Sequence, residues 1–301
     1  MISFKNALVY LIHNRNLFLD SCIKHAGVIL SDEKYLNLRY KLIFGRKINW
    51  NNPITFTEKI QWLKLKDYKD EYTLIVDKYT AKDYVASIIG KSYIIPTIGV
   101  WDNVKDIEWE KLPNQFVLKT THGGGGTGVV ICSSRSSFNK EKAISKLNLS
   151  MKSNTGKVFR EKPYYNIKKR IIAEKYISNG IEELNDYKFF CFNGKVKCFK
   201  VDFGRFNKHH ANYYDEKCQL LPFGEIGLEP NYNHHISIPA NINKMIQIAE
   251  KLSQNFRFIR VDLYNINGNI LFGEITFYPG SGFIPFTSTE WDYKLGNYLA
   301  L

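Results

Sequence analysis

The spacing of apolar residues changes near residue 92 and divides the chain into two regions. Before that point apolar positions recur with helical spacing. We expect helices over Asp32–Phe44, ending at Gly45, and after Asn52-Pro53, capped by Thr55 or Thr57. A third helix is expected over Tyr72–Ile89, before Gly90. Residues 1–91 are therefore predicted to form a mainly helical N-terminal region.

After residue 92 the pattern changes to short apolar runs separated by turn residues, which is typical of strands. A few helices interrupt them, and 152–168 is expected to be a mobile link. This mixture predicts an α+β or mixed α/β fold. The predicted strands are a short run broken at Pro96, Gln115–Thr120, Val129–Cys132, Ile171–Ile177, Asp186–Phe192 and Lys195–Phe203, with helices near Lys140–Leu147 and over Asn241–Gln254.

A predicted β-hairpin near the C-terminus carries charges where burial is expected. Two apolar runs, Phe258–Ile266 and Ile270–Phe277, flank Asn267-Gly268-Asn269, and Arg260, Asp262 and Glu274 interrupt them. A two-residue turn would place the two carboxylates on opposite faces, whereas a three-residue loop pairs 262 with 274 and 260 with 276. Opposed carboxylates could hold one Mg²⁺. The alternative is that Arg260 only forms a salt bridge with one acid.

A glycine-rich segment, THGGGGTG, follows the strand that ends near Lys119. Glycines allow backbone N–H groups to approach phosphate oxygens, and a nearby lysine adds positive charge. The segment lacks the GxxxxGK[ST] pattern and is followed by a strand, so it is not a P-loop. It is predicted to be a flexible loop over a nucleotide; a turn without such a role remains the alternative. His122 beside it would either contact phosphate or shape the turn.

Composition narrows the class of protein. The net charge of +13 indicates an anionic partner, but the basic residues are scattered and no nucleic-acid-binding motif is found, so nucleic acid is not expected. The odd number of cysteines, five, without a CxxC pair favours reduced thiols and a cytoplasmic protein.

No apolar run reaches membrane-spanning length. The first 18 residues would pack on the body or, as an amphipathic helix, contact the inner membrane surface peripherally.

Other residue patterns give weaker signals. The pairs His209-His210 and His234-His235 favour a loop or surface position over zinc, because neighbouring strand residues point to opposite faces. No GxSxG elbow is present for nucleophilic hydrolysis.

An ordered set of motifs resembles the ATP-grasp superfamily. Lys78, Lys119 before the glycine-rich loop, EKYI at 174–177, DYK at 186–188, RVD at 260–262 and GEIT at 273–276 occur in that superfamily's order. The stretches TFTEKIQWLKLKD, LPNQFVLKTTHG, RVDLY and GEITFYPGSGF resemble the TupA-like group from teichuronopeptide and cell-surface polysaccharide biosynthesis. The resemblance implies an ATP-grasp fold with a small lobe over 92–178 and a large lobe over 179–301, with ATP between them.

The resemblance also implies roles for individual residues. Lys78 and Lys119 match the lysines that hold the ATP phosphates, and Gly123–Gly128 matches the flap that closes over them. The metal ligands would be Asp262, Glu274 and Thr276, where Thr276 replaces a usual Asn and so leaves one or two Mg²⁺ ions open. Arg260, assisted by Arg205, would stabilise the transferring phosphoryl group. Glu174, Lys175 and Ile177 would lie at the adenine and Asp186 near the ribose. The other expected nucleotide-binding residues are Lys188, His122, Gly123, Gly124, Gly125 and Gly126.

The implied activity is ATP- and Mg²⁺-dependent carboxylate–amine ligation through an acyl phosphate. The expected acceptor is an acidic saccharide of a capsular or O-antigen polysaccharide, and the second partner is an amine donor. A phosphotransferase, a glycosyltransferase of the same pathway type or a non-catalytic nucleotide-binding module are the alternatives. The helical N-terminal region departs from the usual substrate-binding layer of the superfamily.

Overall fold

The computed structural model describes residues 15–180, 183–205 and 207–301. Most of the predicted N-terminal amphipathic segment, residues 1–14, lies outside the described residues. In the described part no helix is long and apolar enough to cross a membrane. The helices are α2 (Arg15–Ala26), α3 (Asp32–Phe44), α4 (Phe56–Lys66), α5 (Tyr72–Val76), α6 (Thr80–Ile89), α7 (Lys140–Lys152), α8 (Thr155–Phe159), α9 (Ile242–Ser253) and α10 (Thr289–Tyr298).

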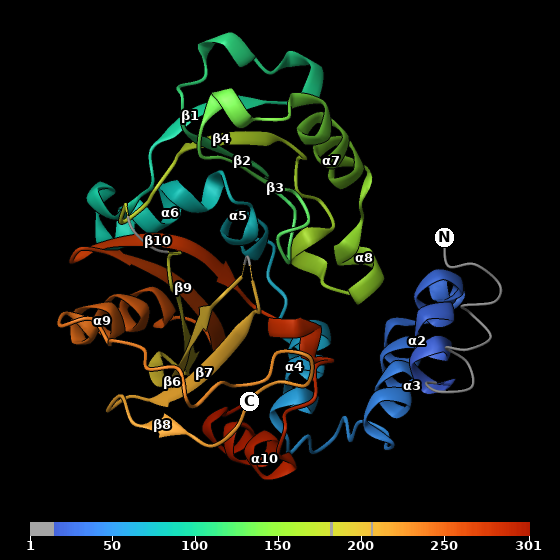
Figure 1. Ribbon diagram of the computed structural model, residues 1–301. Coiled ribbons are helices and arrows are strands. Elements are labelled where there is room, and N and C mark those ends of the chain that lie inside the picture. Colours follow the sequence, from blue (N-terminus) through green and yellow to red (C-terminus); the bar gives the residue numbers. More distant parts are fainter. Residues whose placement is uncertain (1–14, 181–182, 206) are drawn as a thin grey trace.

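The strands form two antiparallel sheets, which lie one above the other in Figure 1. The smaller sheet has the order β1-β4-β2-β3 and the larger one the order β10-β9-β5-β6-β7-β8. The strands are β1 (Thr97–Trp101), β2 (Phe116–Thr120), β3 (Val129–Cys132), β4 (Ile171–Lys175), β5 (Asp186–Phe192), β6 (Lys195–Phe203), β7 (His210–Asp215), β8 (Leu220–Leu221), β9 (Phe258–Ile266) and β10 (Asn269–Thr276).

Strand alternation gives each sheet one apolar face and one face with charges. In the small sheet, Phe116 and Leu118 of β2 pack in the core beneath α7, so Lys119 lies on the opposite face. In the large sheet, Val261 and Leu263 of β9 are buried on the face covered by α9. The charged residues of β9 and its neighbours therefore occupy the other face of the large sheet.

Helix α4 covers one end of that charged face. Its first residue, Phe56, contacts the rings of Phe190, Phe192 and Phe258, at centroid distances of 6.3, 5.8 and 5.0 Å. The helix begins with a capping box between Thr55 and Glu58, as the predicted Thr cap requires. Aromatic packing thus fills one end of the face, and the charged side chains remain at the end that α4 does not cover.

A predicted helix and a predicted mobile link differ from the structure. The expected single helix over Tyr72–Ile89 is two helices, α5 and α6, separated at Asp77–Tyr79. Asp77 Oδ1 accepts hydrogen bonds from the N–H groups of Tyr79 and Thr80, at 2.8 and 3.2 Å, and so begins α6 as a new helix. The segment expected to be a mobile link, 152–168, contains α8 and a short 3₁₀ helix, η6 (Lys162–Tyr164).

Candidate functional site

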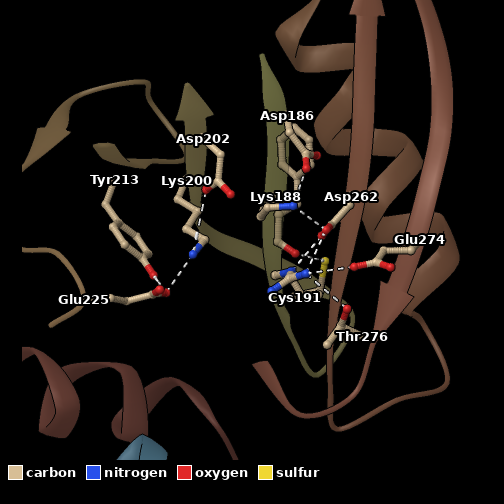
Figure 2. A network of polar contacts seen from close by, with 12 residues as sticks. Asp186, Lys188, Cys191, Lys200, Asp202, Tyr213, Glu225, Asp262, Glu274 and Thr276 are labelled. Carbon is tan, nitrogen blue, oxygen red and sulfur yellow. Dashed lines mark hydrogen bonds and ion pairs between the residues drawn. The ribbon is translucent and has the colours of Figure 1, made fainter. Parts of the chain in front are cut away.

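Arg260 and Asp262 form the centre of the charged face. The Arg260 guanidinium donates from Nε to Asp262 Oδ1 at 2.7 Å and from Nη2 to Oδ2 at 2.8 Å, a bidentate pair. Lys188 of β5 donates to the same Oδ2 at 2.7 Å, as Figure 2 shows. Asp262 is only 2% exposed, so both of its oxygens are held by cations inside the protein.

Glu274 links this centre to the rest of the site. It receives hydrogen bonds or ion pairs from Arg260 Nη2 at 3.3 Å and Lys78 Nζ at 3.1 Å. Burial would raise the pKa of Glu274, but Lys78 and Arg260 outweigh it and hold that pKa well below the usual value. Its side chain is 34% exposed, far more than that of Asp262. Glu274 is therefore the carboxylate of the pair that an incoming cation reaches more easily.

The hairpin register pairs the two predicted carboxylates, but through a shorter turn and a β-bulge instead of the predicted three-residue loop. Asn267 and Gly268 both have positive φ, 51° and 87°, and Asn269 already pairs with Ile266, so the predicted three-residue loop is wrong. The register shifts between Phe272 and Glu274, where Gly273 adds one residue to β10. This β-bulge restores the predicted pairs, 262 with 274 and 260 with 276. Thr276 Oγ1 accepts a hydrogen bond from Arg260 at 3.2 Å.

Lys78 reaches across to the glycine-rich loop from the break between α5 and α6. Its Nζ donates to the Gly123 carbonyl at 2.7 Å as well as to Glu274, and its backbone N–H donates to the Thr121 carbonyl at 3.0 Å. The predicted helical position of Lys78 is wrong, because this residue lies in a turn. The turn lets the lysine contact the small-sheet loop with its backbone and the large sheet with its side chain.

Lys119 and Glu174 lie together on the charged face of the small sheet. Glu174 is 5% exposed and pairs with Lys119 at 2.6 Å and with Lys82 of α6 at 2.5 Å. Burial would raise the pKa of Glu174, but Lys119 and Lys82 hold it below the usual value. Lys82 also donates to the Ile95 carbonyl at 2.7 Å, and sequence analysis missed it. In the helical spacing of this segment a lysine is expected to face solvent, so no local feature of the sequence indicated that Lys82 pairs with Glu174.

The neighbouring adenine candidates lie at the end of β4. Lys175 donates its backbone N–H to the Pro96 carbonyl at 3.0 Å. The predicted strand was too long, because β4 ends at Lys175 and Ile177 follows it outside the strand. Lys175 is exposed and Ile177 is half-buried.

The glycine-rich loop has the backbone freedom that its sequence suggests. Gly125 and Gly126 have φ of +60° and +74°, which favour glycine, and a Cβ on Gly124, Gly125 or Gly126 would meet no atom within 4 Å. Gly128 is a glycine for another reason, since a Cβ there would lie 2.1 Å from Thr120 Oγ1. The tip of the loop, from Gly124 to Thr127, is exposed, while Gly123 is buried beside Lys78.

His122 is turned away from this tip. The residue is 8% exposed, and its Nε2 lies 3.1 Å from the Ser150 carbonyl at the end of α7. Burial lowers the pKa of His122, so a neutral ring is favoured. Of the two predicted roles, this geometry matches shaping the turn.

Asp186, Lys188 and Arg205 form a second part of the charged face. Asp186 Oδ2 is paired with Lys188 at 2.5 Å and with Arg205 at 2.6 Å. Arg205 also pairs with Asp202 at 3.0 Å and is directed to these two acids, not to the Arg260–Glu274 centre with which it was grouped. Burial raises the pKa of Asp186 despite these cations. Within the described residues no hydrogen-bond donor reaches the buried Asp186 Oδ1.

The charged face continues beyond the predicted residues. Lys200 of β6 lies 2.8 Å from Glu225 and 3.8 Å from Asp202, and Tyr213 donates to Glu225 at 2.5 Å (Figure 2). Sequence analysis did not select these residues, because Lys200 and Asp202 alternate with apolar residues as in any half-exposed strand. Only the register of β5 against β6, which opposes Asp186 and Asp202, joins them to the site.

The oxygen atoms around Asp262 and Glu274 are the candidate ligands of Mg²⁺. Within the described residues no group of three or more His, Cys, Asp or Glu side chains converges as a metal site. The chain instead offers two carboxylates and the Thr276 hydroxyl, all oxygen, which fits Mg²⁺ ligated partly by phosphates and waters. Of the histidine pairs, His209 contacts Asp202 at 3.5 Å and His234 stacks on Phe203 at 4.6 Å.

Comparisons with known proteins identify the family of this chain. The family model TupA-like ATPgrasp matches residues 58–300. Members of the ATP-grasp superfamily are typically ATP-dependent carboxylate–amine ligases. A search of curated proteins gives no match.

Solved structures of ATP-grasp enzymes are similar at low identity. D-alanine–D-alanine ligase from Helicobacter pylori is 14% identical, with a TM-score of 0.43 over 81% of this chain and 69% of that chain. The Bacillus anthracis enzyme complexed with ATP is 16% identical, with a TM-score of 0.39 over 67% of this chain and 53% of that chain. This chain thus spans about half the length of the latter, and such likenesses do not identify its reaction. Because the family model covers most of the sequence, the chain belongs to the TupA-like ATP-grasp family and has the mixed α+β ATP-grasp fold.

Proposed function

We propose that this protein is an ATP- and Mg²⁺-dependent carboxylate–amine ligase that amidates an acidic sugar of a cell-surface polysaccharide. The observation that carries the proposal is the meeting of Lys78, Arg260 and Glu274 beside the glycine-rich loop. Lys78 touches both Gly123 of the loop and Glu274 of the large sheet, at 2.7 and 3.1 Å. A triphosphate between the two sheets would therefore meet cations and a carboxylate at once.

In this proposal the nucleotide lies between the charged faces of the two sheets. Lys78 and Lys119 hold its phosphates, and the N–H groups of Gly123–Gly126 close over them. Backbone groups of Glu174 and Ile177, together with Lys175, line the adenine. Asp186 would accept a ribose hydroxyl, and Lys188, at 2.5 Å, partly offsets the rise that burial causes in the pKa of that acid.

Asp262 and Glu274, with Thr276, would hold Mg²⁺. When bound, the metal ion neutralises phosphate charge and polarises the γ-phosphoryl group. Arg260 and Lys188 bind Asp262 here, so both cations are within reach of the same phosphate region. Arg260 then stabilises the charge that develops on the transferring group, with Arg205 at the far side of Asp186 holding the acid network in place.

The chemistry follows from the low reactivity of a carboxylate towards amines. A carboxylate oxygen of the acceptor attacks the γ-phosphorus, the bond to the β-phosphate oxygen breaks, and ADP leaves an acyl phosphate. The amine nitrogen then attacks the acyl carbon, and phosphate leaves. The chain's part is to position the reactants and to neutralise charge, which its lysines and Arg260 supply.

The net charge of +13 supports an acidic acceptor, and the resemblance of the sequence motifs to the TupA-like group motivates the choice of a surface polysaccharide. We assign the reaction to the cytoplasm, where ATP is available, with the basic surface drawn to anionic lipid.

The test supplies Mg-ATP, a mixture of ammonium and amino acids, and either oligogalacturonic acid or its carboxyl-reduced analogue. Amide and phosphate are expected only with the acidic sugar. A phosphorylated sugar, or equal phosphate release with the reduced analogue, would favour a phosphotransferase instead.

A further inference from the structure

An open groove of about 550 Å³ lies on the small lobe, outside the site proposed for ATP. It runs between α7 and the loop that joins β1 to β2, which carries two short 3₁₀ helices, η3 (Val104–Asp106) and η4 (Trp109–Lys111). A volume of this size lies within the range of about 300–1,000 Å³ that is usual for sites of small ligands. The residues that line the groove are Asn103, Val104, Lys105, Trp109, Lys140, Ile144, Asn148 and Met151.

The groove lies on the side of the small sheet that α7 covers (Figure 1). Leu147 of α7 packs with Leu118 of β2 in the core of the small lobe, and Ile144 and Met151 of α7 lie at the edge of that core. Lys119 follows Leu118 in β2 and therefore points to the opposite face of the sheet. The small sheet thus separates a ligand in the groove from the proposed nucleotide, and the proposed reaction uses none of the lining residues.

Trp109 gives the groove an aromatic surface that neighbouring residues hold in place. Its ring packs on Phe138 at a centroid distance of 6.0 Å, and its carbonyl accepts a hydrogen bond from Arg135 Nη2 at 2.6 Å. Lys140 Nζ lies 5.3 Å from the centre of the ring. Trp109 is half-buried, so part of its surface is open to a ligand. The negative face of an aromatic ring attracts the C–H groups of a sugar ring, whose hydrogens carry partial positive charge.

The charges that line the groove are both positive. Lys105 and Lys140 are exposed, and among the described residues neither ammonium group has a carboxylate partner. No carboxylate is among the lining residues. Three acids of the loop are already engaged, Asp106 by a groove amide at 2.9 Å, and Glu108 and Glu110 by basic side chains at 2.5 and 3.7 Å. Charge complementarity therefore favours an anionic ligand.

The remaining polar groups distinguish between kinds of anion. Asn103 and Asn148 add amide groups, which both donate and accept hydrogen bonds and so suit hydroxyl groups. The lining contains no arginine and no glycine, which are the residues best suited to bind a phosphate group. An aromatic face for C–H groups, amides for hydroxyl groups and lysines for carboxylates together match an acidic saccharide.

We propose that this groove is a second binding site, which holds an acidic saccharide chain through Trp109, Lys105 and Lys140. The inference rests on the proposed function only for the choice of an acidic sugar as the ligand, and it requires no step of the ligase reaction. A chain bound here stays on the protein while one of its carboxylates reacts elsewhere. Such a second contact raises the effective concentration of the remaining sugar units.

The experiment uses the full chain, labelled with ¹⁵N in its tryptophan indole groups, without ATP. The Trp109 signal is identified by its absence from the spectrum of Trp109→Phe. We expect oligogalacturonic acid to shift this signal until it saturates, and to leave the signal of Trp101, which packs on the same core outside the groove, in place. The carboxyl-reduced analogue should bind about tenfold more weakly, because two charge pairs are lost.

Three lysine variants complete the test. Lys105→Ala and Lys140→Ala, at exposed side chains, should each raise the Kd about threefold. Lys146→Ala is the matched control, at an exposed lysine of α7 that does not line the groove, and should bind as wild type does.

A Trp109 signal that does not move, or equal affinities of all three lysine variants, would overturn the inference. An equal shift with inorganic tripolyphosphate would also overturn it, because the groove would then bind anions without regard to the sugar. If the Trp109 signal responds as expected but wild type forms no amide, the second site stands and the proposed ligase function fails.

Discussion

Removing the charge of Glu174 should destabilise the protein by about 3 kcal/mol. In Glu174→Gln, the ammonium groups of Lys82 and Lys119 lose the carboxylate that lies 2.5 and 2.6 Å from them. Their side chains are only 10% and 17% exposed, so water replaces little of that interaction. Breaking one side of a buried ion pair costs about 3–5 kcal/mol. The lower value is expected because the glutamine carbonyl still accepts one hydrogen bond and Lys82 keeps the Ile95 carbonyl.

The pH dependence of this difference has a definite sign. The pKa of Glu174 is lowered in the folded protein, so its ionisation stabilises the fold above the unfolded-state pKa of about 4.3. The stabilisation is lost as the pH falls through the lower, folded-state pKa. The difference between wild type and Glu174→Gln should therefore be complete at pH 7 and shrink below about pH 4.

Urea unfolding followed by tryptophan fluorescence measures the effect, since Trp101 and Trp109 both pack on the small-sheet core. The matched control is Glu108→Gln. Glu108 pairs with Lys111 at the same 2.5 Å, but the two side chains are 53% and 76% exposed, so a change below about 1 kcal/mol is expected. If the two variants lose equal stability, burial of the Glu174 pair is not the cause and the reasoning fails.

Three further predictions concern the site. Glu274→Gln should abolish ATP turnover and should destabilise the protein less than Asp262→Asn does, because the Glu274 side chain is 34% exposed and that of Asp262 only 2%. Turnover equal to that of wild type would refute the role of Glu274 as a metal ligand. Amide hydrogen exchange over 122–128 should slow on adding Mg-ATP, since the glycines lose backbone freedom when the loop closes, and exchange insensitive to Mg-ATP would contradict a phosphate-binding loop. The affinity for oligogalacturonic acid should fall at least tenfold between about 50 and 500 mM salt, because salt screens the attraction between exposed charges over this range. An affinity that does not depend on salt would contradict recognition by charge.

Periodicity predicted most of the elements and the charged hairpin, because those features depend on neighbours in sequence. It could not predict the Gly273 bulge, since an inserted residue leaves the alternation on each side intact. The predicted pairing of Asp262 with Glu274 was therefore correct, although the predicted loop was wrong. The break at Asp77 was missed although its signal is local. Asp77 suits a helix interior poorly, and its side chain accepts hydrogen bonds from the N–H groups of Tyr79 and Thr80 at the start of α6.

The features that could not be predicted from the sequence depend on contacts between residues far apart in the chain. Lys64 and Gln61 belong to the stretch TFTEKIQWLKLKD, whose helix and cap were predicted from local signals. Their partners lie 217 and 220 residues away at Ser281, so no local pattern could assign them. The helical N-terminal region thus has two functions in the structure. Through Phe56 it covers the apolar end of the large sheet. Through Gln61 and Lys64 it holds a left-handed turn at 280–282, where φ is 53°, 56° and 62°.

The contacts of Gln61 and Lys64 give a physical reason for the presence of α4 in the N-terminal region, where the superfamily usually has a substrate-binding layer. A left-handed turn containing serine needs external hydrogen bonds, and α4 supplies them from two side chains one helical turn apart, Gln61 and Lys64. Because Gln61 and Lys64 supply these contacts, a change at either residue of α4 would alter the turn at 280–282 without touching the residues proposed to bind ATP.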